Sequence, residues 1–451
     1  MDNPLRSPIL KGLEEYQNKS KLRFHMPGHK GTLPEEFNAL AENLYSFDVT
    51  ELDDTDDLYY PVSFLAESLN DLKKDRKSKE SFYLVNGSTV GILSSVMGLL
   101  DPGDKILIES GCHKSVHNAV KLGRLKKVVL EQPSHKKGFP LPASEEKIFE
   151  ILEEDKDIKM VFLTRPNYYG YASDIEKLAA YCSERGIYTI IDEAHGSHFV
   201  YSSLFPKSAV ESGCSISINS FHKTMPSFTQ TAVLNIGSLN EEDIQRVRSM
   251  LLMLQTSSPS FLFIASLDLS FRYMQKYKEK FLSLKKMIDL FLRKLENNIH
   301  ISAEMDSEKD FTRILLYPKG NVIDMLSYLE KNGIYAEMHD ENTIVLISTI
   351  LDEERDFNRL YNTIENYKRS PSISSPQNKI HDNIGLPFLE CEGKELLEDI
   401  YIYPPGSLYL EKGTILEKKH LVELAKFRKQ KIRLHKSVSK NDDLLYVNID
   451  K

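Results

Sequence analysis

Between about Ser81 and Ile236, short apolar runs alternate with segments that have the residue spacing of helices. Such alternation is typical of βαβ units, in which consecutive strands lie parallel in one sheet and helices cover its faces. The segment 174–185 is one of the helical stretches that separate the runs. The pattern predicts an α/β fold with a mainly parallel central sheet. Its strands are expected at 82–85, 105–108, 160–163, 188–191, 215–218 and 232–234.

A second and smaller α/β pattern follows a helical region. The residues from about Glu241 to Asn298 are expected to be helical, with 261–295 forming one long helix that leaves the first sheet. Beyond it, apolar runs typical of strands again alternate with amphipathic segments typical of helices. These strands and helices are expected at 312–317, 322–332, 343–347 and 353–367.

The chain of 451 residues is too long for one small core, so several domains are expected. The Ser- and Pro-rich segment 370–376 has the composition of a linker. The division that we predict is an N-terminal helix and linker (1–30), a large domain (31–295), a small α/β domain (296–368) and a C-terminal α+β domain (369–451).

The composition gives no sign of a nucleic-acid or membrane partner. The formal net charge is −8, and the chain has no strongly basic stripe with interleaved aromatic residues. The longest apolar stretches, such as 261–267, are much shorter than a membrane span. The four cysteines form no CxxC pair and are expected to be free thiols in a reducing cytosol. We therefore expect a cytoplasmic enzyme.

Polar residues follow two of the expected strands. Asp192 directly ends one apolar run, and Ser220, His222 and Lys223 come just after another. Because open α/β sheets place their ligands at the carboxyl ends of strands, we expect these residues to face one ligand. A lysine that forms a Schiff base and a carboxylate that pairs with a ring nitrogen suit pyridoxal phosphate (PLP). For Asp192 alone, the alternative is a helix cap or a core salt bridge.

A phosphate seat is expected where Gly87, Ser88 and Thr89 link a strand to an apolar helix. Amide groups at a helix N-terminus, together with hydroxyl groups, suit an anion. The alternative is an ordinary turn in which Ser88 caps the helix. His113 follows another strand, where its ring would either stack on a planar cofactor or cap a helix.

Three histidine pairs have spacings that zinc sites use. Pro27 and Gly28 break any helix between His25 and His29, and no glutamate completes an HExxH pattern. We therefore expect no metal site. The other two pairs are His113/His117 and His195/His198.

Nine short motifs occur in a fixed order between about Ser7 and Glu417. They are FHMPGHKG (24–31), Asp57-Leu58 before Pro61, NGST (86–89), CHKSV (112–116), PNYYG (166–170), DEAHG (192–196), SFHKT (220–224), TSSPS (256–260) and YPPG (403–406). In these motifs the chain resembles the Orn/Lys/Arg decarboxylase family, in particular its short, Gram-positive-type members. The resemblance implies a fold-type I, aspartate aminotransferase-like PLP enzyme. It also implies decarboxylation of lysine, arginine or ornithine to the corresponding di- or polyamine and carbon dioxide.

The resemblance assigns roles to individual residues. Lys223 would carry PLP as a Schiff base, with Asp192 on the pyridine nitrogen. Ala194 would pack on one face of the ring and His113 would stack on the other. Ser257 matches a position that reaches the phosphate of a neighbouring subunit, so a homo-oligomer of at least two subunits with shared active sites is implied. The residues expected to hold the phosphate and the surroundings of the lysine are Gly87, Ser88, Thr89, Ser220 and His222, with His195 as a further cofactor-binding residue.

The chain departs from the family pattern after the YPPG motif. Thr414 replaces the glutamate of a Pro-Gly-Glu sequence, and Gly393-Lys394 replaces Gly-Arg. The cofactor residues are intact, and the choice among lysine, arginine and ornithine stays open, as does whether Lys223 or His222 returns a proton to Cα. One alternative is another PLP reaction, such as an aminotransferase, for which Arg313 would clamp the substrate carboxylate, or a C–C lyase. A low-activity regulatory homologue is the other.

Overall fold

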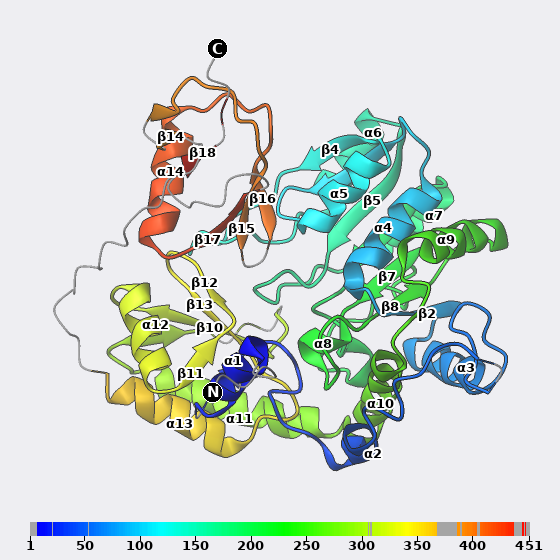
Figure 1. The fold of residues 1–451 in the computed structure, drawn as a ribbon. Helices are drawn as coiled ribbons and strands as arrows, with labels where there is room; N and C mark the ends of the chain where they lie inside the picture. Colours follow the sequence, from blue (N-terminus) through cyan, green and yellow to red (C-terminus); the bar gives the residue numbers. More distant parts are fainter. Residues whose placement is uncertain are drawn as a thin grey trace.

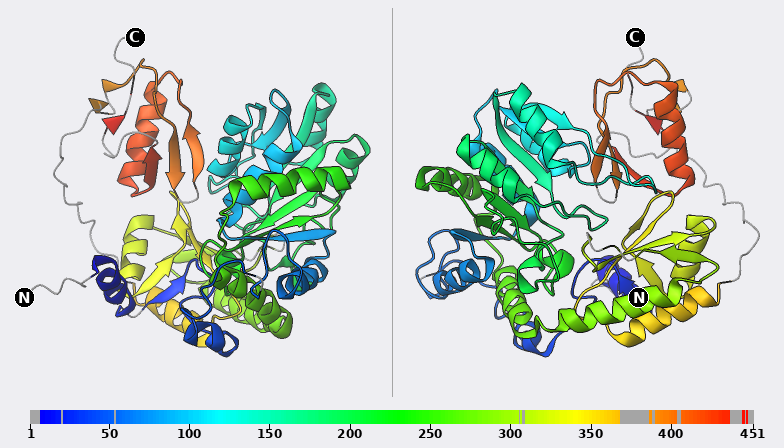
Figure 2. Two further views of the ribbon diagram at one scale, coloured as in Figure 1. Left: turned by 45° about the vertical axis from the view of Figure 1, so that its right-hand side comes forward. Right: turned by 180° about the vertical axis from the view of Figure 1, so that it is seen from behind.

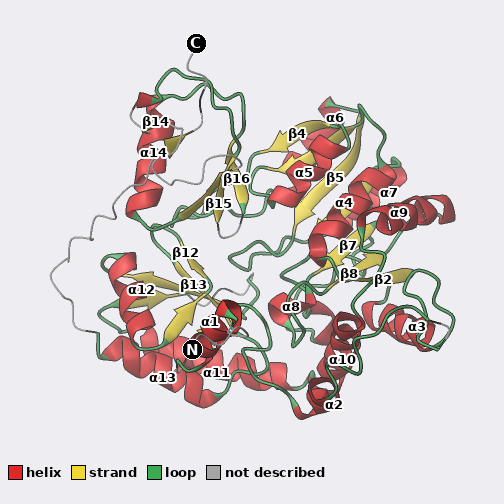
Figure 3. Cartoon of the chain, viewed as in Figure 1, coloured by secondary structure: helices red, strands yellow, loops and turns green. Residues whose placement is uncertain are grey.

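The computed structural model describes residues 7–19, 21–52, 54–304, 306, 309–367, 386–387, 390–403, 406–436, 444–445 and 447. The expected linker 370–376 and the two prolines of the YPPG motif lie outside the described residues. Figures 1 and 3 show three groups of elements: a large sheet with its helices, a smaller sheet beside it, and a C-terminal unit.

Seven of the described strands form the largest sheet, which is parallel except for one strand next to an edge. The pairs from β4 to β7 are parallel, whereas β8 runs antiparallel to both of its neighbours. Each strand expected from the first pattern is present, and β4 was not expected. The spatial order is β2 (Glu80–Leu84), β8 (Ala232–Ile236), β7 (Ile216–Asn219), β6 (Tyr188–Asp192), β5 (Ile158–Thr164), β3 (Lys105–Glu109) and β4 (Lys126–Leu130).

Helices cover both faces of this sheet because successive strand residues point to opposite sides. Ile106 and Ile108 pack with one group of helices, whereas Leu107 packs with the other. The first group is α4 (Gly87–Leu99), α5 (Lys114–Leu122) and α9 (Glu241–Leu254), and the second is α6 (Glu145–Glu154) and α7 (Glu176–Glu184). The short helix α8 (Phe221–Thr224) directly follows β7.

The expected single helix over 261–295 is wrong, because the structure has two helices there. α10 (Phe261–Tyr277) ends before the polar residues Lys278 and Glu279, and α11 (Lys280–Leu295) begins after them. α10 packs beside α3 (Phe64–Arg76), α2 (Asn38–Glu42) and the short helix η1 (Glu35–Phe37), whereas α11 packs on α13 and β9 of the smaller sheet. The break thus turns the chain from one sheet to the other.

The smaller sheet is antiparallel and has the order β12 (Met338–His339), β13 (Ile344–Ile347), β10 (Arg313–Pro318) and β9 (Ile301–Ala303). Its helices are α12 (Val322–Lys331) and α13 (Glu354–Glu365). After helix α1 (Pro8–Gln17), the N-terminal segment returns to this region: β1 (Leu22–Phe24) pairs in parallel with β11 (Ile334–Ala336).

The C-terminal unit has its own small core and lies above the smaller sheet and beside the large-sheet part (Figure 2). Ser407 pairs with His113 of the large-sheet part, and His339 Nε2 lies 2.9 Å from the carbonyl oxygen of Gln430. Among the described residues, no helix is long and apolar enough to cross a bilayer. The elements of the unit are β14 (Leu386–Pro387), β15 (Ile400–Tyr403), β16 (Ser407–Leu410), α14 (Lys418–Lys429), β17 (Arg433–Lys436) and β18 (Leu444–Leu445).

Candidate active site

Lys223 and Asp192 lie at the same edge of the large sheet. β6 ends at Asp192 and is paired in parallel with β7, which leads into α8 and Lys223. Burial lowers the pKa of Lys223, while the charges of Asp192 and Glu337 act in the opposite direction. The sheet therefore brings together the lysine and the carboxylate that the sequence placed at neighbouring strand ends.

The Asp192 carboxylate has little to neutralise it. Its Oδ1 accepts a hydrogen bond of 3.1 Å from the amide of Ala194, which is itself buried. In the described part of the chain, no Lys, Arg or His nitrogen lies within 4.0 Å of it, so the expected alternative of a core salt bridge is not found there. Burial raises the pKa of Asp192, which Lys223 partly offsets. A buried carboxylate without a cation suits a protonated pyridine nitrogen.

The start of α4 leaves its amide groups available to an anion. The helix begins at Gly87, whose φ is +73°, and the cap residue Asn86 makes no side-chain hydrogen bond to the helix. Ser88 therefore does not cap the helix, and that alternative is wrong. Its Oγ instead lies 2.5 Å from the Oγ of Ser220, which joins the start of α4 to the end of β7. Thr89 follows as an exposed residue.

His113 is held with a neutral ring. It caps α5, because its Nδ1 accepts a hydrogen bond of 3.2 Å from the amide of Ser115. Burial, with a contribution from Lys223, lowers the pKa of His113 to about 3. Of the two roles expected for this residue, the cap is present. A neutral flat ring near Lys223 is also compatible with stacking on a cofactor.

His222 lies beside Lys223 and is also neutral. Its Nδ1 lies 2.9 Å from the carbonyl oxygen of Thr231, and since a carbonyl only accepts, Nδ1 carries the proton. Burial lowers the pKa of His222 to about 4. Its Nε2 is therefore an acceptor in the neutral ring and would have to take up a proton before it could donate to a phosphate oxygen.

Two aromatic rings and an arginine complete the surroundings of the lysine. The Nζ of Lys223 lies 3.1 Å from His195 Nε2, and the ring of Tyr168 packs edge-on against His195 with 4.9 Å between centroids. Arg313 is buried, with Nη2 3.0 Å from His195 Nδ1 and Nη1 donating to Thr312. Both terminal nitrogens of Arg313 thus already have protein partners.

Ser257 lies beside the phosphate seat of its own chain and is exposed. The amide of the preceding Thr256 donates a hydrogen bond of 3.1 Å to Oδ1 of Asn86, at the start of α4. The hydroxyl of Tyr59 donates to the carbonyl of Thr256 and so ties a second loop to this place.

The site also includes residues that the sequence did not single out. Glu337, between β11 and β12, accepts a hydrogen bond of 2.9 Å from the amide of Met26. Its charge acts on Lys223, Arg313 and His25. The sequence signal is weak, because Glu337 follows a strand of only three residues. Tyr168 belongs to the PNYYG motif but was not among the expected site residues.

The segment that departs from the family pattern, residues 407–414, runs away from the site. Its first residue, Ser407, pairs with His113 and donates a hydrogen bond of 3.2 Å to the carbonyl of Gly111. Its last residue, Thr414, donates instead to the carbonyl of Glu411. The carboxylate of Glu411 is paired with Lys127, at the amino end of β4. Within one subunit, only the start of the altered segment therefore lies near Lys223.

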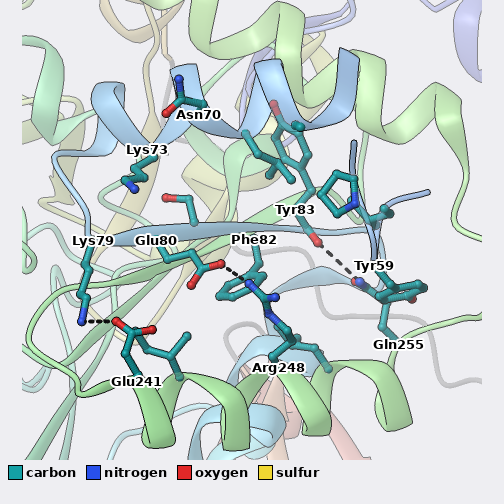
Figure 4. A pocket seen from close by; sticks show the side chains of 17 residues that line it. Tyr59, Asn70, Lys73, Lys79, Glu80, Phe82, Tyr83, Glu241, Arg248 and Gln255 are labelled. Atoms are coloured by element: carbon teal, nitrogen blue, oxygen red, sulfur yellow. Dashed lines mark hydrogen bonds and ion pairs between the residues drawn. The ribbon is translucent and has the colours of Figure 1, made fainter. Parts of the chain in front are cut away.

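A hollow of about 510 Å³ lies elsewhere, between α3, the edge strand β2 and α9 (Figure 4). Lys79 and Glu241 form an ion pair of 2.7 Å across it, and Arg248 pairs with Glu80. None of the residues discussed for the PLP site lines this hollow except Tyr59, so we assign it no part in the chemistry.

Comparisons with known proteins identify the family and the fold of the chain. Residues 7–315 match the family model described as Orn/Lys/Arg decarboxylase, major domain. The chain is 26% identical to an arginine decarboxylase of Bacillus subtilis (strain 168), over 92% of each chain. It is 29% identical to a protein of the same organism named uncharacterized protein YaaO, over 99% of each chain. The structure of the constitutive lysine decarboxylase of E. coli superposes with a TM-score of 0.73 at 14% identity, covering 98% of this chain and 81% of that one. The predicted fold-type I architecture is thereby confirmed, and the chain belongs to the Orn/Lys/Arg decarboxylase family of PLP-dependent amino-acid decarboxylases.

Proposed function

We propose that this chain decarboxylates a basic amino acid, namely lysine, arginine or ornithine, with PLP held at Lys223. One observation carries the proposal: Lys223 and the buried carboxylate Asp192 lie at the same edge of the large sheet. Burial lowers the pKa of Lys223 and raises that of Asp192. The uncapped start of α4 adds a place for a phosphate. These features fit PLP in charge and in chemistry.

When bound, PLP supplies a conjugated ring that accepts the electron pair released as the bond from Cα to the carboxylate breaks. Asp192 stabilises positive charge at the ring nitrogen, which strengthens that acceptance. His113 and Tyr168 place largely apolar faces near Lys223, and such surroundings favour neutral carbon dioxide over a carboxylate. Nζ of Lys223 is the atom that we assign to returning a proton to Cα, and it would first take that proton from the ammonium group of the incoming substrate. The Nδ1 proton of His222 is instead donated to the carbonyl of Thr231.

The charge of Glu337 supports a basic substrate. This half-buried carboxylate from the smaller sheet acts on Lys223, and it is joined to the chain by one backbone hydrogen bond to Met26. A cationic side chain entering the site would be attracted to it. We propose Glu337 as a recognition residue. Glu337→Gln is expected to raise KM for the basic substrate with a smaller effect on kcat.

Arg313 does not suit the role that the aminotransferase alternative requires of it. Such an enzyme needs a free guanidinium to clamp the substrate carboxylate. Arg313 was the candidate from the sequence, but its Nη atoms are bonded to His195 and Thr312 and its side chain is buried. This observation favours decarboxylation over transamination.

We also propose a homo-oligomer of at least two subunits. Ser257 is exposed beside the phosphate seat, and large apolar side chains nearby are exposed as well. Tyr60 is 69% exposed, Val62 87% and Met253 66%, in segments on either side of the contact between Tyr59 and Thr256. A second copy that covers these side chains would also meet Ser257. The cytoplasmic location remains a prediction, which the four free and buried cysteines favour.

The test is release of carbon dioxide from a panel of amino acids by the PLP-loaded protein, with arginine first because of the relatives named above. Borohydride reduction is expected to fix PLP on Lys223, and Lys223→Ala should abolish both results. Lys309→Met is the matched control, since burial also lowers the pKa of Lys309, to about 8. A pyridoxamine product with a keto acid would establish transamination instead. A PLP-bound protein that releases no carbon dioxide from any basic amino acid would be a regulatory homologue.

A further inference from the structure

Three side chains form a row from the cofactor lysine into the interior. Lys223 Nζ lies 3.1 Å from His195 Nε2, and His195 Nδ1 lies 3.0 Å from Arg313 Nη2. His195 is 3% exposed and Arg313 is fully buried, so water does not compete for these contacts. The hydrogen bonds along this row therefore depend on which of the three groups donates and which accepts, and not on water.

The arginine decides which nitrogen of His195 carries the proton. A guanidinium has only N–H donors and stays protonated in proteins. His195 Nδ1 must therefore accept from Arg313, which leaves the single proton of the neutral ring on Nε2. The opposite tautomer would set two N–H groups against each other at 3.0 Å. Burial and the neighbouring cations hold the pKa of His195 well below its usual value, so the ring does not carry a second proton.

Nε2–H of His195 in turn faces the amine of Lys223. An N–H at 3.1 Å from Nζ needs a lone pair there, and only the neutral amine has one. An ammonium group would again place two donors together. The geometry thus selects the form of Lys223 that is nucleophilic.

Arg313 is itself held so that it cannot turn away. Nη2 also donates to the carbonyl of His195 at 3.3 Å, and Nη1 donates to Oγ1 of Thr312 at 3.2 Å. Asp310 Oδ2 lies 3.9 Å from Nη1, and the other oxygen of this carboxylate accepts from the amide of Thr312. The guanidinium is fixed in position and in charge.

The charged groups around Lys223 act in both directions on the protonation of its amine. The groups that face Lys223 from the surrounding elements are Asp192, Glu337, Arg313, His195, His113 and Tyr168. Burial disfavours an ammonium group on Lys223 and so does the charge of Arg313, whereas the two carboxylates favour it.

We propose that Arg313 is a positioning residue: it fixes the tautomer of His195, and the resulting Nε2–H holds the amine of Lys223 neutral and ready to react. The inference rests on the proposed function only through the role of Lys223 as the cofactor lysine. It requires no particular substrate.

The tautomer is measured directly on the full chain freed of PLP, with retention of fold checked by circular dichroism against the PLP-bound protein. Nitrogen NMR of histidine-labelled protein separates protonated from unprotonated ring nitrogens, and the resonances that vanish in His195→Gln are those of His195. The expected result is a protonated Nε2 and a bare Nδ1. A proton on Nδ1 in the unaltered protein would overturn the proposal without any Arg313 variant.

The consequence for Lys223 is measured by its rate of acetylation at a series of pH values, followed by peptide mass spectrometry. Arg313→Met removes the donor to Nδ1, so the His195 proton can move to Nδ1 while Nε2 accepts from an ammonium group on Lys223, and the pH midpoint of Lys223 acetylation should rise. A rise of about one pH unit slows acetylation about tenfold below the midpoint. Arg313→Lys, which restores a charged donor, should restore both readouts.

Arg76→Met is the matched control. Arg76 is also buried, at 3% exposure, but it donates to Asp75 and to the carbonyl of Ser197 rather than to His195. It should leave the His195 tautomer and the Lys223 profile unchanged. An unchanged tautomer in Arg313→Met, or a changed tautomer with an unchanged Lys223 profile, would refute the proposal. Failure to release carbon dioxide would refute the proposed function and leave both of these readouts intact.

Discussion

Burial moves the pKa values of the residues around Lys223, and the direction depends on which form of each group is charged. It raises the pKa of Asp192 but lowers those of His113 and His222, to about 3 and about 4. Both rings are therefore neutral near neutral pH. Neither supplies the positive charge that the carboxylate needs, and the cofactor ring is left to supply it.

Asp192→Asn tests that dependence with almost no change of shape. The amide cannot stabilise positive charge at a ring nitrogen, so kcat should fall by at least about a hundredfold, as when a preorganised charge partner is lost. Steady-state kinetics with saturating PLP measures the loss. Glu109→Gln is the control, because it alters another buried carboxyl group, at the end of β3. Equal losses in both variants would mean that general disruption, rather than the Asp192 charge, is responsible.

His117 should make the protein less stable in mild acid. Burial lowers its pKa to about 4 in the folded protein, against 6.5 for an ordinary histidine. Between pH 4 and pH 6.5 the unfolded chain binds a proton at His117 that the folded chain does not. The contribution of His117 to the free energy of unfolding is therefore fully present above pH 6.5 and is lost as the pH falls towards 4. Nδ1 of His117 is buried without a hydrogen-bond partner, and Phe keeps a ring in that place.

Urea unfolding of the unaltered protein and of His117→Phe, each at about pH 7 and about pH 5, measures the effect. The variant should lose less unfolding free energy between the two pH values. All other titrating groups are common to both proteins, so the difference isolates His117. Parallel losses in the two proteins would show that His117 does not contribute.

At the scale of elements, the sequence predicted what depends on local patterns and missed what depends on distant partners. The strands of the large sheet are apolar on both faces and were found, except β4, which begins with two lysines and is only partly buried. β1 and β11 have three residues each, and they form because they pair with each other although they lie far apart in the sequence. Glu337 escaped notice for the same reason, since its place in the site comes from β11 and from Met26.

The candidate site divides in a similar way. Asp192, Lys223 and Gly87 stand directly at the ends of predictable strands, so their approach to one another follows from the parallel sheet. The contact of Arg313 with His195 joins residues 118 positions apart on different sheets, and no local pattern indicates it. The break between α10 and α11 likewise reflects which sheet each helix packs on.

The start of α4 provides a test at this scale. Gly87 has a φ of +73°, and an added Cβ would meet only a carbonyl oxygen, of Gln230, at 3.9 Å. Gly87→Ala should therefore cost about 1 kcal/mol of unfolding free energy, from backbone strain. It should also weaken binding of PLP several-fold, because the strain shifts the amides that would hold the phosphate. Binding of pyridoxal, which lacks the phosphate, should change less.

Gly103→Ala is the matched variant. Gly103 has a φ of +96° with nothing within 4 Å of an added Cβ, and it lies in the turn before β3. The stability loss should be similar, with unchanged PLP affinity in an absorbance titration. If the two variants bind PLP equally well, the amides at the start of α4 do not hold the phosphate.

At the scale of the whole molecule, the exposed Ser257 separates two ways of building the site. It lies next to the phosphate seat of its own chain, through Thr256 and Asn86. Exposed apolar side chains surround the same place, including Val62 and Tyr60. A shared site predicts that Ser257 serves the neighbouring subunit, whereas a self-contained site predicts that it serves its own.

Mixing two inactive variants distinguishes these arrangements. Lys223→Ala lacks the cofactor lysine, and Ser257→Asp places a negative charge against the phosphate. If Ser257 acts across the interface, a mixed dimer has one site with both residues intact and one with both defects. Random reassociation of equal amounts then restores about a quarter of the normal activity, since about half of the dimers are mixed and each has one working site. Each variant dissociated and reassociated alone is the control. If Ser257 acts within its own chain, every site in the mixture contains a defect and no activity returns, which would contradict the shared site.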